Sequence, residues 1–250
     1  MFSSGYSQQI PTVSTGTAVY CSKLTHRYNS ADRDALSEVT FQVSAGEVVA
    51  LLGHNGAGKT TLLKILAGSL VPSSGKVYVW GTAPRQQPRR VAYLAQRSAL
   101  RWDFPISLRE LVATGTFVRR GWFRGLSRED RNLVERTIRA LGLASFAHRP
   151  ISALSGGQQQ RALLARALVH DADLFLLDEP FTAVDEETCQ ILLAQFAQLK
   201  NQNRTLIITT HNCDAFEALR PRKIVLRDGK VEVDTFSQQG SNRKADHVAG

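Results

Sequence analysis

Short apolar runs alternate with longer stretches of helical periodicity along most of this chain. Val48–Leu52 and Leu174–Leu177 are continuously apolar, which is typical of strands that are buried on both faces of a sheet. Val39–Val43 instead alternates apolar and polar residues, which predicts a strand with one exposed face. The remaining predicted strands are Lys76–Trp80, Val91–Leu94, Thr205–Thr209 and Ile224–Leu226.

Helical periodicity fills the intervals between these strands. Leu62, Leu63, Ile65 and Leu66 have the spacing of one buried helix face. Alternation of strands and helices predicts an α/β fold with a mainly parallel sheet. The longer predicted helices are Gln158–Val169, Glu186–Leu199 and a stretch over Ser107–Gly142 that is broken at 119–125 and restarts at Ser127.

The length of 250 residues and an apolar content of 43% suit one large domain. We expect this domain at 18–237, with a helical subdomain at about 97–155 and flexible tails at 1–17 and 238–250. No apolar run approaches the ~18–20 residues that cross a bilayer, and the N-terminus lacks the features of a signal peptide. A cytosolic location is therefore expected unless a partner holds the chain at a membrane.

Positive charge is concentrated in one segment. The chain carries 31 Lys and Arg against 22 Asp and Glu, a net charge of +9. Residues 85–149 contain 14 Arg, no Lys and 5 acidic residues, and the rest of the chain is balanced. Such confinement argues against a nucleic-acid-binding protein. The cluster Arg119–Gly125, with Trp122 and Phe123, is interpreted as a solvated loop in preference to a contact with anionic headgroups or an acidic partner.

A glycine-rich segment between a predicted strand and a predicted helix has the spacing of a phosphate-binding loop. Its glycines let backbone N–H groups face phosphate oxygens, Lys59 can bridge the β- and γ-phosphates of ATP, and the Thr60 hydroxyl can bind Mg²⁺. The positive end of the following helix adds to the same anion site. The candidate nucleotide-binding residues are Gly53, His54, Asn55, Gly56, Ala57, Gly58, Lys59, Thr60 and Thr61.

Two later motifs specify the kind of nucleotide-binding protein. Leu154–Gln158 reads Leu-Ser-Gly-Gly-Gln, and after a helical run Leu174–Pro180 is an apolar strand that ends in Asp-Glu-Pro. With the glycine-rich loop, these resemble the Walker A, signature and Walker B motifs of the ATP-binding cassette (ABC) ATPases, from about Val19 to Val233. The resemblance implies a P-loop fold with a mainly parallel core sheet, an antiparallel β region and an inserted α-helical subdomain.

The same resemblance assigns the hydrolytic residues and implies ATP and Mg²⁺ as cofactors. Asp178 resembles the Walker B aspartate that holds Mg²⁺ together with Thr60, and Glu179 takes the position of the general base. Gln96 resembles the Q-loop glutamine, which contacts both Mg²⁺ and the attacking water. His211 resembles the switch histidine that bridges the γ-phosphate and the catalytic glutamate.

Further resemblances concern the adenine base and a second subunit. Tyr28 lies where the A-loop aromatic of the family stacks on adenine, and Tyr20 is the nearby alternative. Asp185 resembles the D-loop aspartate that communicates across a dimer, and it can also cap the helix that follows. In the family the signature residues cap the ATP of the opposite subunit, which implies a head-to-tail pair; these residues are Ser155, Gly156, Gly157 and Gln158.

A single cassette points to a transporter subunit. Translation-type ABC proteins carry two cassettes, and DNA-repair ABC ATPases separate their motifs far more widely than the 119 positions between Lys59 and Asp178. A transporter cassette implies a separate polytopic permease and an extracytoplasmic substrate-binding protein. Residues 96–115 and Trp122–Arg124 resemble the cassettes of manganese, zinc and iron importers. The alternatives are another cargo, such as a siderophore or cobalamin, and a soluble regulatory ATPase without a permease.

Overall fold

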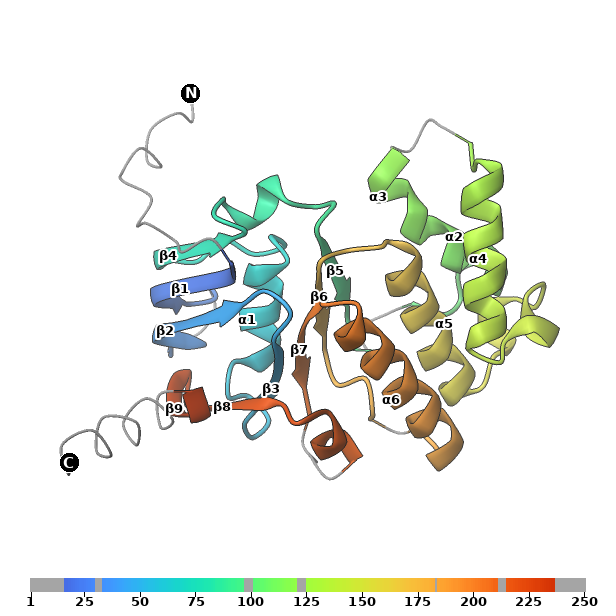
Figure 1. Ribbon diagram of the computed structural model, residues 1–250. Helices are drawn as coiled ribbons and strands as arrows, with labels where there is room; N and C mark the ends of the chain where they lie inside the picture. Colours follow the sequence, from blue (N-terminus) through green and yellow to red (C-terminus); the bar gives the residue numbers. More distant parts are fainter. Residues whose placement is uncertain are drawn as a thin grey trace, which may run out of the picture.

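A six-stranded sheet forms the core of the protein, as the computed structural model in Figure 1 shows. The structure describes residues 16–29, 33–96, 101–120, 125–182, 184–210 and 215–236. In spatial order the core strands are β5 (Val91–Leu94), β6 (Leu174–Leu177), β7 (Thr205–Thr209), β3 (Val48–Leu52), β8 (Arg222–Arg227) and β9 (Lys230–Asp234). Neighbouring strands run parallel except for β9, which forms an antiparallel hairpin with β8.

A three-stranded antiparallel sheet lies beside this core (Figure 1). The residues of β2 (Leu36–Ser44) alternate between buried and less buried, as the pattern of Val39–Val43 predicts. Strand β4 (Ser74–Val79) starts before the predicted Lys76–Trp80, because Ser74 pairs with Thr25. It stops before Trp80, whose backbone is left-handed with a φ of 50°. The strand order is β2 (Leu36–Ser44), β1 (Thr17–His26) and β4 (Ser74–Val79).

Helices cover both faces of the core sheet, and others form the inserted subdomain beside it. They are α1 (Lys59–Leu66), α2 (Leu108–Ala113), α3 (Phe117–Arg120), α4 (Arg128–Ala140), α5 (Gly156–Val169) and α6 (Glu186–Asn201). Short 3₁₀ helices are η1 (Pro84–Gln86), η3 (Thr114–Thr116), η4 (Ala144–Phe146), η5 (Ile151–Ala153) and η6 (Ala215–Leu219). The inserted subdomain consists of α2, α3 and α4, to one side of the core and next to α5 (Figure 1). Within the described ranges, no helix is both long and apolar enough to span a bilayer.

Serine caps begin three of these helices. Ser107, Ser127 and Ser155 each accept a hydrogen bond from the backbone N–H three residues later, and the side chain at that later position bonds back to the serine N–H. The cap at Ser127 confirms the predicted restart of the helix there. Because Ser155 caps α5, this helix begins at Gly156, two positions before the predicted start at Gln158.

The parallel strands are buried on both faces, as their apolar runs predict. In β3, Val48 and Ala50 pack with α5 and α6, whereas Val49 and Leu51 pack with α1 and the three-stranded sheet. The fold class predicted from the sequence is therefore confirmed. Parallel pairing also sets the carboxyl ends of β3, β6 and β7 along one edge of the sheet, where functional loops of such folds gather.

Several stretches that the sequence singled out lie outside the described residues. They include 1–15 and 238–250 of the expected tails, 237 at the end of the expected domain, and 97–100 of the segment that follows Gln96. Residues 121–124 of the basic cluster, with Trp122 and Phe123, and the candidate switch residue His211 also fall there. The predictions made for them therefore stay predictions.

Candidate functional site

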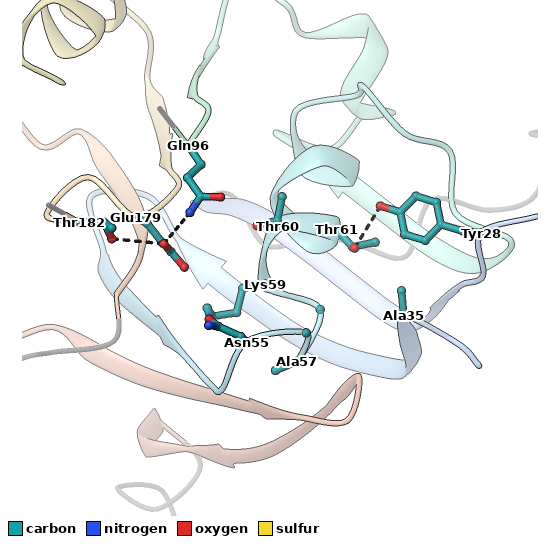
Figure 2. A pocket seen from close by; sticks show the side chains of 12 residues that line it. Tyr28, Ala35, Asn55, Ala57, Lys59, Thr60, Thr61, Gln96, Glu179 and Thr182 are labelled. Atoms are coloured by element: carbon teal, nitrogen blue, oxygen red, sulfur yellow. Dashed lines mark hydrogen bonds between the residues drawn. The ribbon is translucent and has the colours of Figure 1, made fainter. Parts of the chain in front are cut away.

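A cavity of about 670 Å³ lies at the carboxyl ends of β3 and β6 (Figure 2). It brings together parts of the chain that are far apart in sequence, including the phosphate-binding loop, Gln96 and Glu179. Ala35 and Thr182, which the sequence did not single out, complete its wall. The lining residues are Tyr28, Ala35, Asn55, Gly56, Ala57, Gly58, Lys59, Thr60, Thr61, Gln96, Glu179 and Thr182.

The glycine-rich loop needs glycine at two points where it packs against other backbone. Gly53 and Gly58 have φ angles of 149° and 100°, a region that residues with a Cβ rarely adopt. A Cβ at Gly53 would lie 2.3 Å from the carbonyl oxygen of Leu226, and one at Gly58 would lie 2.4 Å from that of Ala35. The loop continues directly into α1. The first residues of this helix line the cavity, so its free N-terminal N–H groups lie at the cavity wall.

Lys59 is held within this loop. Its Nζ atom donates hydrogen bonds to the carbonyl oxygens of Gly53, at 2.6 Å, and His54, at 3.1 Å. Burial lowers the pKa of Lys59, and the negative charges of Glu179 and Asp178 oppose this shift. The ammonium group therefore lies in an anion-binding loop with two carboxylates close enough to influence its charge.

Two consecutive acidic residues, Asp178 and Glu179, follow β6, and their side chains lie in different environments. Asp178 is buried, and its Oδ1 atom accepts a hydrogen bond from the Thr209 hydroxyl at 2.9 Å. Its Oδ2 atom accepts one from the Tyr93 hydroxyl at 3.4 Å. Glu179 has a left-handed backbone with a φ of 51°, and of the two residues it is the one that lines the cavity.

Figure 2 shows the Glu179 carboxylate between Gln96 and Thr182. Its Oε2 atom accepts hydrogen bonds from Nε2 of Gln96 at 2.9 Å and from the Thr182 hydroxyl at 3.2 Å. Gln96 follows β5 and Glu179 follows β6, so the parallel pairing of these strands brings the two residues together. The contact orients a carboxylate toward the phosphate-binding loop.

The aromatic residue in the cavity wall is Tyr28. Its hydroxyl lies 3.2 Å from Oγ1 of Thr61, and its ring meets the ring of His26 edge to face at 4.8 Å between centroids. Tyr20, the alternative, lies in β1 with its ring 6.3 Å from that of Tyr78 and is not in the cavity wall. His54 is also absent from the cavity wall; its Nε2 atom lies 3.5 Å from the Asp228 carboxylate.

The signature residues lie away from this cavity. Ser155 accepts a hydrogen bond from the N–H of Gln158 at 3.3 Å, and the side chain of Gln158 accepts one from the N–H of Ser155 at 3.0 Å. A Cβ at Gly157 would lie 2.9 Å from Oγ1 of Thr188, so the first turns of α5 and α6 are in close contact. None of the four signature residues, Gly156 included, lines the cavity.

Asp185 caps α6, as one interpretation of the sequence predicted. Its Oδ1 atom accepts a hydrogen bond from the N–H of Thr188 at 2.8 Å. Hydrogen bonding with Thr188 lowers the pKa of the Asp185 carboxyl. The side chain therefore stays ionised at the positive end of a helix, beside the first turn of the signature helix.

Three residues contact the acidic pair although no motif marked them: Tyr93, Thr182 and Thr209. Thr182 lies three positions after Glu179, where a turn returns the chain to the carboxylate. Thr209 is the last residue of β7, and only the pairing of Leu177 with Ile208 places it beside Asp178. The signal in the sequence that could have indicated Thr209 is a polar residue that closes an apolar run, since a polar group in such a strand needs a hydrogen-bond partner.

A glycine-rich loop between a buried strand and a helix, facing a carboxylate that follows another parallel strand of the same sheet, defines a nucleoside triphosphatase of the P-loop class. The sequence model of the ABC transporter family matches residues 36–182, and the chain belongs to this family. It is an ATP-binding transporter subunit and an ATPase.

Relatives across most of the chain are transport ATP-binding proteins. The zinc transport system ATP-binding protein TroB of Treponema pallidum (strain Nichols) is 39% identical over 212 residues, which cover 85% of this chain and 79% of TroB. The manganese transport system ATP-binding protein MntB of Bacillus subtilis (strain 168) is 35% identical over 185 residues, which cover 74% of each chain.

Solved structures share the fold. The dimeric structure of an ATP-binding cassette in a post-hydrolysis state, bound to ADP and Pi, aligns with a TM-score of 0.77 at 26% identity and covers 86% of this chain and 97% of its own. An inward-facing transporter described as of the metal-chelate type aligns with a TM-score of 0.75 at 27% identity and covers 88% of this chain and 84% of its own.

Proposed function

We propose that the chain hydrolyses MgATP in the cavity of Figure 2 and thereby drives import of a divalent transition metal, zinc, manganese or iron, through a separate permease. The observation that carries the catalytic part is the contact of 2.9 Å between Gln96 and Glu179 at the wall of the phosphate-binding cavity. Glu179 is then the general base, since it is the carboxylate that faces the loop.

The residues present fit a magnesium ion. Thr60, Gln96 and Asp178 offer a hydroxyl, an amide and a carboxylate oxygen, the donors that Mg²⁺ prefers when substrate phosphates and waters complete its shell. Both oxygens of Asp178 already accept hydrogen bonds from side chains, so this carboxylate is oriented by its neighbours. Bound Mg²⁺ would neutralise charge on the phosphates.

The residues of the chain then divide the work of hydrolysis. The N–H groups of the loop and the Lys59 ammonium bind the phosphates, for which Nζ exchanges its bonds to the carbonyls of Gly53 and His54. Glu179 accepts a proton from the attacking water, with its carboxylate oriented by Gln96. We assign the γ-phosphate contact of the switch residue to His211.

Tyr28 is proposed to stack on the adenine base. Its ring lines the cavity and is 39% exposed, so one surface is open to a ligand. The hydroxyl contact with Thr61 and the edge contact with His26 hold the ring in place. Because the ring is already held in place, less side-chain conformational entropy is lost when a base binds.

The signature residues and Asp185 are proposed to act on a second copy. They begin two helices outside the cavity, so one chain does not bring the signature helix to its own phosphate loop. The similar cassette bound to ADP and Pi is dimeric. A head-to-tail pair would place the start of α5 of each copy, with Ser155, Gly156, Gly157 and Gln158, at the ATP of the other.

A groove beside β5 is the proposed permease contact. It encloses about 210 Å³ between β5, the α2–α3 region and α5, and Thr114, Val118 and Arg166 are among its lining residues. Phe104, in the segment between Gln96 and α2, is 61% exposed, the largest exposed fraction of any large apolar side chain within the described residues. A permease here would hold the chain at the cytoplasmic face of the membrane, with an extracytoplasmic binding protein delivering the cargo.

The cargo proposal rests on the relatives and on residues 96–115. TroB and MntB are named for zinc and manganese transport. The test is to disrupt the gene and measure cellular zinc, manganese and iron by elemental analysis under limiting supply. We expect reduced accumulation of one metal and sensitivity to chelators. Unchanged uptake of all three would overturn the metal assignment, and uptake of a siderophore or cobalamin would then be measured in the same strain.

A further inference from the structure

One buried hydroxyl joins the two consecutive carboxylates of the site. The Thr209 side chain donates a hydrogen bond to Oδ1 of Asp178 at 2.9 Å and accepts one from the N–H of Glu179 at 2.7 Å. Thr209 is completely buried at the end of β7. Both bonds are therefore shielded from water, where the loss of a partner has its largest effect.

The bond to the Glu179 N–H supports an unusual backbone. Glu179 has a φ of 51°, which non-glycine residues hold only when their surroundings fix them. This conformation lets Glu179 line the cavity while Asp178, the preceding residue, does not. Gln96 and Thr182 fix the carboxylate of Glu179, whereas Thr209 fixes its backbone.

We infer that Thr209 is a positioning residue that sets the directions of Asp178 and Glu179 together through its hydroxyl group. The inference rests on the roles proposed for these two carboxylates. A shared hydroxyl makes the placement of the metal-binding carboxylate depend on that of the base, because Oγ1 cannot move toward one without changing its distance to the other. The β7 strand thereby holds both groups that follow β6.

The decisive variants are Thr209→Val and Thr209→Ser. Valine keeps the shape of threonine but leaves Oδ1 of Asp178 and the N–H of Glu179 without this partner, whereas serine keeps the hydroxyl. We expect Thr209→Val to lower kcat by ~10–100-fold, with the Kd for ATP in the absence of Mg²⁺ changed less than about threefold, because the phosphate loop is untouched. Thr209→Ser should recover most of kcat.

A second readout does not depend on turnover. Calorimetric titration with ADP in the presence and absence of Mg²⁺ measures how strongly the ion supports nucleotide binding. Because Asp178 loses one of its two side-chain hydrogen bonds, Thr209→Val should reduce this magnesium-dependent gain severalfold and leave ADP binding without Mg²⁺ unchanged. Tyr93→Phe removes the other, longer bond and should affect the magnesium-dependent gain without touching the Glu179 backbone.

Thr205→Val is the matched control. Thr205 lies at the other end of β7, is equally buried and accepts a hydrogen bond from the Gly46 N–H at 2.9 Å. This variant should lower the thermal midpoint of unfolding about as much as Thr209→Val but keep kcat. Both variants lose a buried hydroxyl, but only Thr209→Val loses one that contacts Asp178 and Glu179. A fall in kcat in Thr209→Val alone is therefore due to those contacts and not to lower stability.

Two results would overturn the inference: a folded Thr209→Val protein with the kcat and magnesium response of the unmodified chain, or a Thr209→Ser protein as slow as Thr209→Val. If Thr209→Val fails to fold, the inference is still open to contradiction, because a folded Thr209→Ser protein with a kcat or magnesium response lowered ~10-fold or more would overturn it. Failure of the proposed role of Glu179 is recognised separately, since Glu179→Gln would then retain turnover.

Discussion

At the residue scale, the proposed site depends on side chains that are oriented before any ligand binds. The carboxylate of Glu179 has two side-chain donors, and the ammonium of Lys59 has two backbone acceptors in its own loop. Lys59 is proposed to bind the phosphates and Glu179 to accept a proton from water. Removal of Lys59 should therefore affect nucleotide binding, and removal of Glu179 should affect turnover. Orientation of this kind reduces the rearrangement needed when substrate arrives.

We predict that Glu179→Gln keeps ATP binding but nearly abolishes turnover. The amide cannot accept the proton of the attacking water, whereas the loop that holds the phosphates is unchanged. The variant should therefore trap an ATP-bound dimer, which size-exclusion chromatography with ATP can detect. A monomer that continues to hydrolyse ATP would contradict both the role of Glu179 and the proposed dimer.

Lys59→Ala should instead weaken nucleotide binding itself. The substitution removes a buried cation from direct contact with the phosphates, and hydrogen bonds between charged groups are strong enough to change affinity by ~10–100-fold. Equilibrium binding of a fluorescent ATP analogue measures the loss. The cavity-wall variant Tyr28→Ala serves as a comparison, because it should weaken binding while the affinity for inorganic pyrophosphate stays the same.

At the scale of elements, the segment between β5 and α2 contains two aromatic residues with different surroundings. Trp102 packs against the core cluster that also contains α2 and α5, whereas Phe104 is 61% exposed. The sequence alone does not distinguish them, since both belong to residues 96–115, the segment that resembles metal-importer cassettes. Packing instead gives Trp102 a share in the stability of the core, and leaves Phe104 as the better probe of a docking surface.

Phe104→Ala should therefore reduce permease association and transport while the basal ATPase of the isolated subunit stays near its original rate. Trp102→Ala should lower the free energy of unfolding by ~2–3 kcal/mol, because it removes apolar contacts from a packed cluster. Co-purification with the permease, ATPase assays and thermal unfolding distinguish the two outcomes. Equal loss of folding in both variants would argue for a purely structural segment.

At the scale of the whole molecule, the proposed assembly rests on the absence of the signature residues from the cavity wall of their own chain. Because α5 begins outside the cavity wall, we propose that two copies combine the phosphate loop of one chain with the signature of the other. Each composite site then takes Lys59 from one copy and Ser155 from the other. Mixed dimers of two different variants test this directly.

Ser155→Arg and Lys59→Ala proteins should each lack ATPase activity when assayed alone with the permease. Mixed in equal amounts, they should regain activity, because one of the two sites in each heterodimer keeps both intact parts. Random pairing leaves about a quarter of all sites competent. Wild-type activity of the Ser155→Arg protein alone would show that the signature does not act on a partner.

The sequence by itself determined the elements and the chemistry of the loop. Apolar runs such as Val48–Leu52 match observed strands, because burial on both faces of a sheet imposes a local pattern. The glycine-rich spacing likewise reflects local needs, since Gly53 and Gly58 occupy backbone conformations that exclude a side chain. The family was therefore recognisable from motifs alone, and the comparisons confirm it.

Only the tertiary structure decided which distant side chains meet. The contacts of Gln96 with Glu179 and of Thr209 with Asp178 depend on the order β5-β6-β7, which no local pattern specifies because pairing joins segments far apart in sequence. Burial likewise separated Trp102 from Phe104, since both are apolar and aromatic but only one packs on the core. Local periodicity determines whether a segment forms a helix or a strand, and long-range packing determines which segments lie next to it.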